Sequence, residues 1–227
     1  MEFHIENLLL ILESVLLVFT IILLLYSIRE GRHRDALIAE VGRATRILTR
    51  QEYFMNLTDA MLGAKEEVIG AITGRTPQKE DVKKIHSIVA HIEKLVEKGV
   101  HVAYLIPKFP DRLYVGSHYT RAGADVRYSS CLMVQDLRYT LIDHHQILLG
   151  VPEGTGNQEA TKKGYNIPSE GLAAMLEENF YNCWEQSPTY EEYVREVLQE
   201  TGADPKLLAR EFQIDEKEIE RISRAGS

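Results

Sequence analysis

The stretch that decides the fold is Gln135-Asp-Leu-Arg-Tyr-Thr-Leu-Ile-Asp-His-His-Gln-Ile-Leu-Leu-Gly-Val-Pro152. Apolar and polar side chains alternate in its first half, a polar break follows at residues 143–146, and an apolar run resumes from Ile147 to Val151. Such alternation is typical of a strand with one buried face, and two strand patterns around a short polar break indicate a hairpin. The stretch therefore predicts two antiparallel strands joined by a tight turn.

Strands and helices alternate on the N-terminal side of this hairpin. The predicted elements are a strand from Glu67 to Thr73, a helix from Lys79 to Glu97, a buried strand from Val100 to Pro107, a short helix from Arg112 to Ala122 and a strand from Asp125 to Tyr128. After the hairpin, residues 153–168 have the polar, glycine-rich composition of a loop, and an amphipathic helix follows from Ser169 to about Trp184. This order predicts an α/β sandwich with a partly parallel sheet.

The spacing of polar residues in the hairpin resembles the signature of the phospholipase D-like superfamily. That signature is a His, any residue, a Lys, four residues and an Asp, followed by a return strand that ends in Gly-Ser. In this frame Asp136 stands in place of the His, Arg138 in place of the Lys, and Asp143 in place of the Asp. Gly150-Val151 stands in place of the Gly-Ser.

Two connecting phrases strengthen the resemblance, which spans roughly Tyr53 to Ser187. They are Lys98-Gly-Val-His-Val-Ala-Tyr-Leu105, similar to the family's passage from a helix end into a strand, and Ala122-Gly-Ala-Asp-Val-Arg127, similar to its Ala-Gly-Ala passage. The resemblance implies a phospholipase D-like mixed-sheet sandwich. We expect an N-terminal transmembrane helix before this sandwich and a helical C-terminal tail after it.

The activity that the resemblance implies depends on imidazoles, and this chain has none at the aligned position of the signature histidine. In the family, one His attacks phosphorus while a second, from another copy of the motif, protonates the leaving oxygen. The carboxylate of Asp136 is a poorer nucleophile, repels the anionic oxygens and is not an acid at neutral pH. Because side chains alternate along a strand, Asp136 and Arg138 are predicted to share one face and to neutralise each other. The sequence therefore favours a pseudoenzyme with no catalytic residue.

Four residues are candidates for ligand binding: Asp136, Arg138, Asp143 and His145. The guanidinium of Arg138 can hold a phosphate or carboxylate through two parallel hydrogen bonds, and the alternative is a salt bridge to Asp136. Asp143 either orients its neighbours, as the resemblance implies, or bonds the turn backbone. His144 and His145 could restore the missing imidazole only if the alignment with the signature shifted by a few residues. Otherwise they are exposed turn residues.

No metal site or cofactor follows from the sequence. The adjacent histidines need further ligands, and nothing in the spacing of His118 or Asp125 requires them to provide one. Cys131 and Cys183 are too far apart in sequence to indicate a zinc knuckle or a disulfide framework, so a reducing compartment is expected.

An apolar run from Leu8 to Ile28 has the length that crosses a bilayer. A cleaved signal peptide is the alternative, but the leader carries acidic residues and no small-residue cleavage site follows. Basic residues occur only after the run, at Arg29, Arg32 and Arg34. The positive-inside rule then places the N-terminus outside and the rest of the chain in the cytoplasm, so a single-pass membrane protein is predicted.

Residues 35–70 show a helical pattern whose lower part is expected to dock on the predicted domain. Val41, Leu48, Met55 and Leu62 recur at every seventh position. A coiled-coil stalk in a parallel homodimer is one interpretation, and an amphipathic helix lying on its own domain is the other. The predicted organisation is an anchor at 1–28, a juxtamembrane helix at 29–52, a phospholipase D-like domain at 53–187 and a helical tail at 188–227.

The tail consists of predicted helices with clear starts. One runs from Thr189 to Thr201, a second begins at Asp204-Pro205, and Asp215 with Glu218 resembles the capping box of a third. The last two resemble a helix-turn-helix, but the would-be recognition helix is rich in Glu and the chain has a net charge of -8. Nucleic acid binding is therefore disfavoured, and the tail is predicted to contact a protein partner.

Together these features favour a membrane-anchored sensor or scaffold that binds an anionic ligand or a protein partner. The resemblance implies a homodimer in which two hairpins meet across a shared cleft. Two alternatives stay open. One is an active phosphodiesterase, a nuclease or phospholipase that works as a dimer with an imidazole not yet placed, and the other is a purely structural membrane scaffold.

Overall fold

The computed structural model describes residues 12, 15–24, 26–27, 42, 45–77, 81–152 and 161–225. The chain divides into two units, Met1–Arg43 and Ala44–Ser227. The described residues of the first unit are helical. Within the described residues, no helix combines the length and apolar character needed to cross a bilayer. Part of the predicted span from Leu8 to Ile28 lies outside these residues, and the span stays a prediction.

The second unit is built on one seven-stranded mixed sheet with the order β1-β7-β6-β5-β2-β3-β4. Its strands are β1 (Arg46–Thr49), β2 (Glu67–Ala71), β3 (His101–Pro107), β4 (Asp125–Ser129), β5 (Arg138–Ile142), β6 (Gln146–Pro152) and β7 (Thr161–Pro168). Strands β2, β3 and β4 are parallel, whereas β5, β6, β7 and β1 form antiparallel pairs beyond β2. The predicted hairpin is confirmed, since β5 pairs with β6 from Arg138 opposite Gly150 to Ile142 opposite Gln146.

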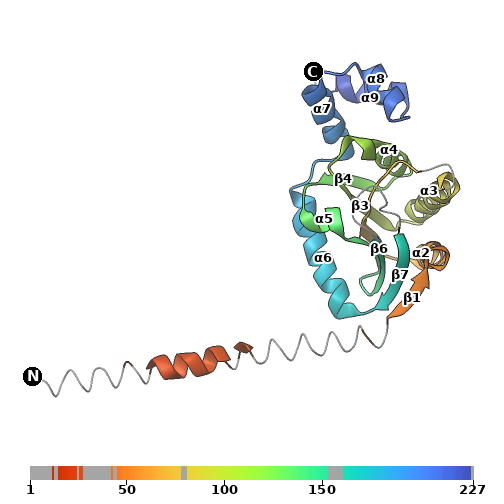
Figure 1. The fold of residues 1–227 in the computed structure, drawn as a ribbon. Coiled ribbons are helices and arrows are strands. Elements are labelled where there is room, and N and C mark those ends of the chain that lie inside the picture. The colour runs from red at the N-terminus through yellow and green to blue at the C-terminus, as the bar shows by residue number, and fades with distance from the viewer. Residues whose placement is uncertain are drawn as a thin grey trace, which may run out of the picture. The chain divides into compact units, whose positions relative to one another are not determined.

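Helices cover both faces of this sheet (Figure 1). They are α2 (Arg50–Gly63), α3 (Val82–Glu97), the 3₁₀ turn η1 (Pro110–Arg112), α4 (Leu113–Arg121), α5 (Leu132–Asp136), α6 (Glu170–Glu185), α7 (Tyr190–Thr201), α8 (Pro205–Glu211) and α9 (Glu216–Arg224). Helices α2, α3 and α4 pack their buried side chains on one face. Helix α6 lies across the other face, where Phe180 is fully buried. The predicted α/β sandwich with a mixed sheet is therefore confirmed.

The continuous helix predicted for residues 35–70 is wrong over its described part, because the chain there forms β1, α2 and β2 in turn. The break comes at Thr49, whose hydroxyl caps α2 while the Glu52 carboxylate accepts a hydrogen bond from the Thr49 N–H at 2.8 Å. Leu48 is buried in β1, but Met55 is 56% exposed, so the seven-residue repeat does not form one stripe. Helix α2 instead lies on its own domain, which was the alternative interpretation.

The predicted loop at residues 153–168 is also wrong in its second half, where β7 pairs with both β6 and β1. Polar residues and Gly164 hid this strand because it lies near the edge of the sheet, where one face is only partly covered. The Cβ of any other residue at position 164 would collide with the ring of Tyr53, so the glycine lets α2 approach the strand closely.

The C-terminal helices pack onto the same unit as the sheet. Ile214, Ile219 and Ile222 are buried in one core cluster with residues of α4 and α7. The predicted N-caps are present, since Asp204 accepts from the Lys206 N–H and Asp215 accepts from the Lys217 N–H. The predicted capping box of Asp215 with Glu218 is wrong, because the Glu218 carboxylate accepts a hydrogen bond from the Ser117 hydroxyl instead. These helices therefore extend the hydrophobic core of the domain.

Candidate functional site

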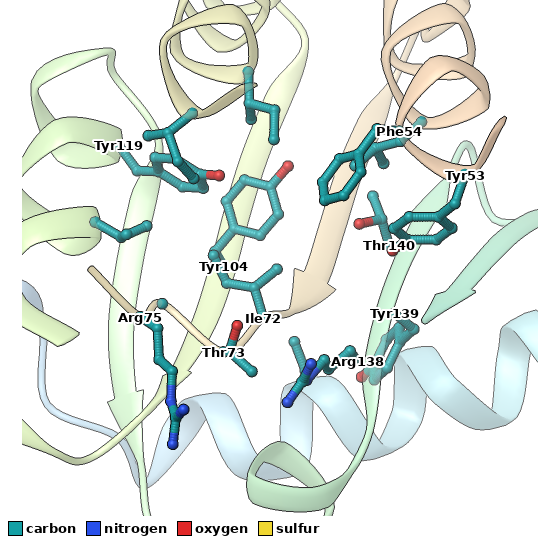
Figure 2. A pocket seen from close by; sticks show the side chains of 16 residues that line it. Tyr53, Phe54, Ile72, Thr73, Arg75, Tyr104, Tyr119, Arg138, Tyr139 and Thr140 are labelled. Atoms are coloured by element: carbon teal, nitrogen blue, oxygen red, sulfur yellow. The ribbon is translucent and has the colours of Figure 1, made fainter. Parts of the chain in front are cut away.

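A cavity of about 140 Å³ opens on the face of the sheet covered by α2, α3 and α4 (Figure 2). It lies where the chain leaves the carboxyl end of β2 and where antiparallel β5 begins beside it. Open α/β sheets bind their ligands in such crevices at the carboxyl ends of parallel strands. The cavity is therefore the first candidate for a binding site.

Aromatic rings and cations share the lining of this cavity. The lining includes Tyr53 from α2, Tyr104 from β3, Tyr119 from α4, Arg75 from the segment after β2, and Arg138 and Thr140 from β5. Arg138 is only 9% exposed. Gly70 in β2 lets β5 approach, because an added Cβ there would collide with the Tyr139 carbonyl oxygen.

Arg75 and Arg138 place two cationic side chains in the lining of the cavity. Burial raises the pKa of Tyr53 to about 12, although the nearby charge of Arg138 acts in the opposite direction. Burial also raises the pKa values of Tyr104 and Tyr119, so all three hydroxyls stay protonated. Among the described lining residues there is no carboxylate, imidazole or thiol. This lining can bind an anion, but it offers no side chain whose pKa suits proton transfer at neutral pH.

Asp136 does not share a strand face with Arg138, and that prediction is wrong. It is the last residue of α5 and is exposed, and the Leu137 N–H donates to the Met133 carbonyl at 2.8 Å to close that turn. The strand begins only at Arg138. Asp136 is also not among the described residues that line the cavity.

Asp143 lies at the opposite end of β5 from Arg138. Five residue steps along a strand separate the two residues by about 17 Å, so they cannot hold the same small ligand. Asp143 has a φ of 47° and accepts hydrogen bonds from the backbone N–H groups of Lys65 at 3.0 Å, Glu66 at 2.9 Å and Glu67 at 3.1 Å. Burial alone would raise its pKa, but these hydrogen bonds outweigh burial and lower the pKa. Asp143 therefore ties the hairpin turn to the start of β2.

The two turn histidines also lie at this second end, and both are exposed, as predicted. His145 Nδ1 is 2.7 Å from the Asp143 carbonyl oxygen, and His144 Nδ1 is 3.0 Å from Glu177 Oε2. The hydrogen bond with Glu177 raises the pKa of His144, with burial acting weakly against it. Neither imidazole lines the cavity, so a slipped register does not bring one beside Arg138.

The tyrosines of the cavity were missed by sequence reasoning. Tyr104 sits inside a strand pattern that is otherwise apolar, and Tyr53 and Tyr119 sit on the buried faces of two helices. The sequence signal for these residues is a tyrosine within an otherwise apolar pattern. A buried tyrosine usually directs its hydroxyl toward a hydrogen-bond partner or a cavity.

Comparison with known proteins gives a fold but no family. No protein-family model matches the chain, and no curated protein matches it. Among solved structures, Nuc from Salmonella typhimurium, a phospholipase D family member, is similar with a TM-score of 0.51 and 17% identity over 64% of this chain and 97% of Nuc. NucT from Helicobacter pylori is similar with a TM-score of 0.50 and 12% identity over 64% of this chain and 98% of NucT.

The chain has a phospholipase D-like fold. At these identities the likeness concerns the fold alone, and the phospholipase D-like domain must be assigned a function from its own residues. Nothing in the single chain tests the predicted homodimer, which stays a prediction.

Proposed function

We propose that the phospholipase D-like domain binds a small anionic ligand and acts as a sensor or scaffold, without hydrolysing phosphodiesters. The observation that carries the proposal is the buried guanidinium of Arg138 in a cavity walled by tyrosines. A guanidinium offers a rigid set of donors that matches a phosphate or a carboxylate. Its attraction for an anion is stronger in such a partly desolvated site than in water.

The other lining groups indicate what else the ligand carries. Tyr53, Tyr104 and Thr140 provide hydroxyls that donate or accept hydrogen bonds, and the phenol rings provide flat apolar walls. A cavity of about 140 Å³ admits only the anionic group and the few atoms attached to it. The ligand class is therefore a small phosphate ester or carboxylate whose anionic group enters the cavity, while a larger body stays at its mouth.

The arrangement of ionisable groups argues against a phosphodiesterase. A nucleophilic imidazole has to stand within hydrogen-bond reach of the substrate, whereas His144 and His145 follow the far end of β5, about 17 Å from Arg138. The tyrosines stay protonated because burial raises their pKa values. If the predicted homodimer forms, the cavity of its second copy has the same lining, which includes no imidazole among the described residues.

The proposal includes attachment to a membrane through residues 8–28, with the domain on the cytoplasmic side. Its support is the apolar run and the basic residues Arg29, Arg32 and Arg34 that follow it. Extraction of membranes with carbonate should leave the full chain in the pellet. Release of the chain into the supernatant would contradict this part of the proposal.

A thermal-shift assay of the purified chain with a panel of ligands tests whether the domain binds a small anion. The panel contains inorganic phosphate, sugar phosphates, nucleoside monophosphates, dicarboxylates and neutral sugars. A ligand that binds only the folded state at 100 times its Kd stabilises the protein by about 2.7 kcal/mol, which raises its Tm. We expect anionic members to raise the Tm and neutral sugars to leave it unchanged.

The control variants locate the binding site. Arg138→Met keeps most of the side-chain volume and removes the charge, and it should abolish the shift. Arg121→Met, an exposed arginine at the end of α4, should keep it. A shift that survives in Arg138→Met, or turnover of a phosphodiester substrate by the wild-type chain, would contradict the proposal.

A further inference from the structure

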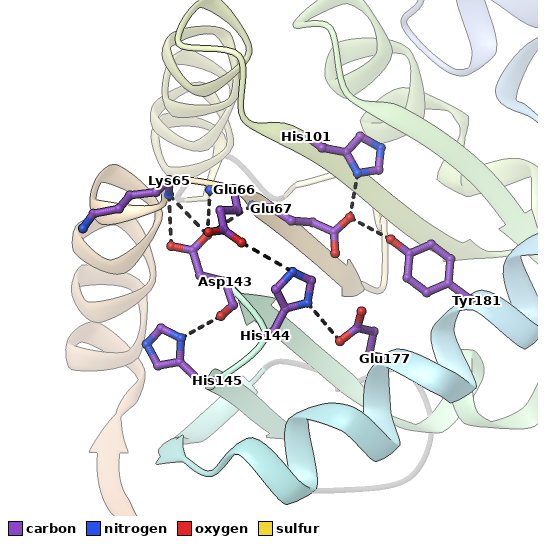
Figure 3. Close-up of polar contacts among 9 residues, drawn as sticks. All are labelled: Lys65, Glu66, Glu67, His101, Asp143, His144, His145, Glu177 and Tyr181. Carbon is purple, nitrogen blue, oxygen red and sulfur yellow. Dashed lines mark hydrogen bonds and ion pairs between the residues drawn. The ribbon is translucent and has the colours of Figure 1, made fainter.

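A second group of polar side chains converges at the end of the sheet opposite the Arg138 cavity (Figure 3). Glu67 begins β2, His144 lies in the turn between β5 and β6, and Glu177 lies on α6. One ligand atom from each of the three lies within 4.8 Å of the others. We propose that Glu67, His144 and Glu177 bind a divalent metal ion of the zinc type.

The carboxylate of Glu67 is already oriented for this role. Its Oε1 accepts a hydrogen bond from the Tyr181 hydroxyl at 2.7 Å and lies 2.8 Å from His101 Nδ1. Both contacts end on the same oxygen, so the second oxygen points away from Tyr181 and His101, on the side of His144 and Glu177 (Figure 3). Hydrogen bonds of this kind fix the first ligands of protein metal sites.

The spacing of His144 and Glu177 suits a shared ion. His144 Nδ1 and Glu177 Oε2 are 3.0 Å apart. Zinc bonds to nitrogen and oxygen are about 2.0–2.1 Å long, which places two tetrahedral ligands about 3.3 Å apart. The two side chains therefore need to separate by only a few tenths of an ångström to accept an ion between them.

Charge also favours a cation at this position. Within the described residues, the ion pairs of Glu67 and Glu177 join them to histidines and to no lysine or arginine. Glu66 and Asp125 add further carboxylates around His144 and His101. A neutral imidazole leaves this carboxylate charge uncompensated, and a divalent ion would offset much of it.

The ligand set selects the class of metal. One imidazole with two carboxylates suits zinc among the common divalent ions, and three protein ligands leave the fourth tetrahedral position to water. The side chains of His144 and Glu177 are 46% and 27% exposed, so ion and water can reach them. Because the three ligands come from β2, the hairpin turn and α6, the ion would link these elements and raise the stability of the domain.

Isothermal titration of the full-length chain with zinc chloride tests the proposal, after removal of any histidine tag and of trace metal with a chelator. We expect saturable binding of one equivalent at neutral pH and a rise in Tm. Cobalt should bind the same site and give the intense visible absorption of a tetrahedral complex.

Matched variants test which side chains bind the metal. Glu177→Gln keeps the shape of the side chain, and His144→Asn keeps a residue that tolerates the φ of 60° at this position. Each should weaken zinc binding by at least about tenfold and remove the cobalt absorption. Tyr181→Phe should weaken binding less than Glu177→Gln. Glu178→Gln, an exposed neighbour on the same helix, should bind zinc like the wild type.

Two results would overturn the assignment. One is a folded wild-type chain that binds no zinc. The other is equal zinc affinity in the wild type, Glu177→Gln and His144→Asn, which would place the metal elsewhere. Neither result depends on the Arg138 cavity, because that cavity shares no lining residue with the proposed metal site.

Discussion

The two ends of β5 differ in almost every physical respect. At the Arg138 end a buried cation faces tyrosine rings in a cavity, whereas at the Asp143 end carboxylates and histidines form a partly exposed polar network. Both residues belong to one sequence pattern, but five steps along an extended strand place them about 17 Å apart. The Arg138 end is therefore suited to an anion, whereas the Asp143 end, where we propose a metal site, holds the hairpin against β2 and α6.

Replacing Asp143 should produce the largest loss of stability at either end. Asp143→Ala removes the acceptor of three backbone N–H groups and places alanine at a positive φ. Allowing for partial exposure, we expect a loss of about 3–4 kcal/mol in chelator-containing buffer, measured by urea unfolding. Asp59→Ala, an exposed aspartate on α2, is the control. Equal stability of the two variants would show that Asp143 is not structural.

Alkaline pH should lower the stability of the folded protein through the tyrosines at the cavity end of β5. The pKa of Tyr53 is raised to about 12 against an ordinary value of about 10, so the folded state holds a proton that the unfolded state releases first. This contribution to stability is on the order of 2–3 kcal/mol. It is intact below about pH 10 and is lost as the pH rises toward 12. Denaturant unfolding across this range measures the loss. A Tyr53→Phe variant that loses as much stability as the wild type over this range would contradict the burial of the Tyr53 hydroxyl.

Filling the space behind Tyr53 should have a smaller effect. Gly164→Ala places a Cβ against the Tyr53 ring, which must then move into the cavity. We expect a stability loss of about 1–3 kcal/mol together with weaker ligand binding. Gly63→Ala is the matched control, since an added Cβ there meets nothing within 4 Å. A Gly164→Ala variant with normal stability and normal affinity would mean that Tyr53 does not form the wall.

The sequence predicted the hairpin and the parallel strands because their apolar patterns are strong. It misplaced Asp136 because Asp136, Leu137 and Arg138 continue the alternation of β5 by chance, while a short helical turn already holds Asp136. It missed β7 because a strand near a sheet edge has a polar composition. The cavity could not be predicted, since Tyr53, Tyr104 and Tyr119 meet only after three separate elements pack together.

Phosphorus NMR of the purified chain mixed with a simple phosphodiester and a sugar phosphate tests the central claim most directly, because it detects both binding and cleavage. We predict saturable broadening of a phosphate ester resonance that disappears in Arg138→Met, with no new monoester signal at any time. A monoester that accumulates with the wild-type chain and not with Arg138→Met would show that the cavity is an active site.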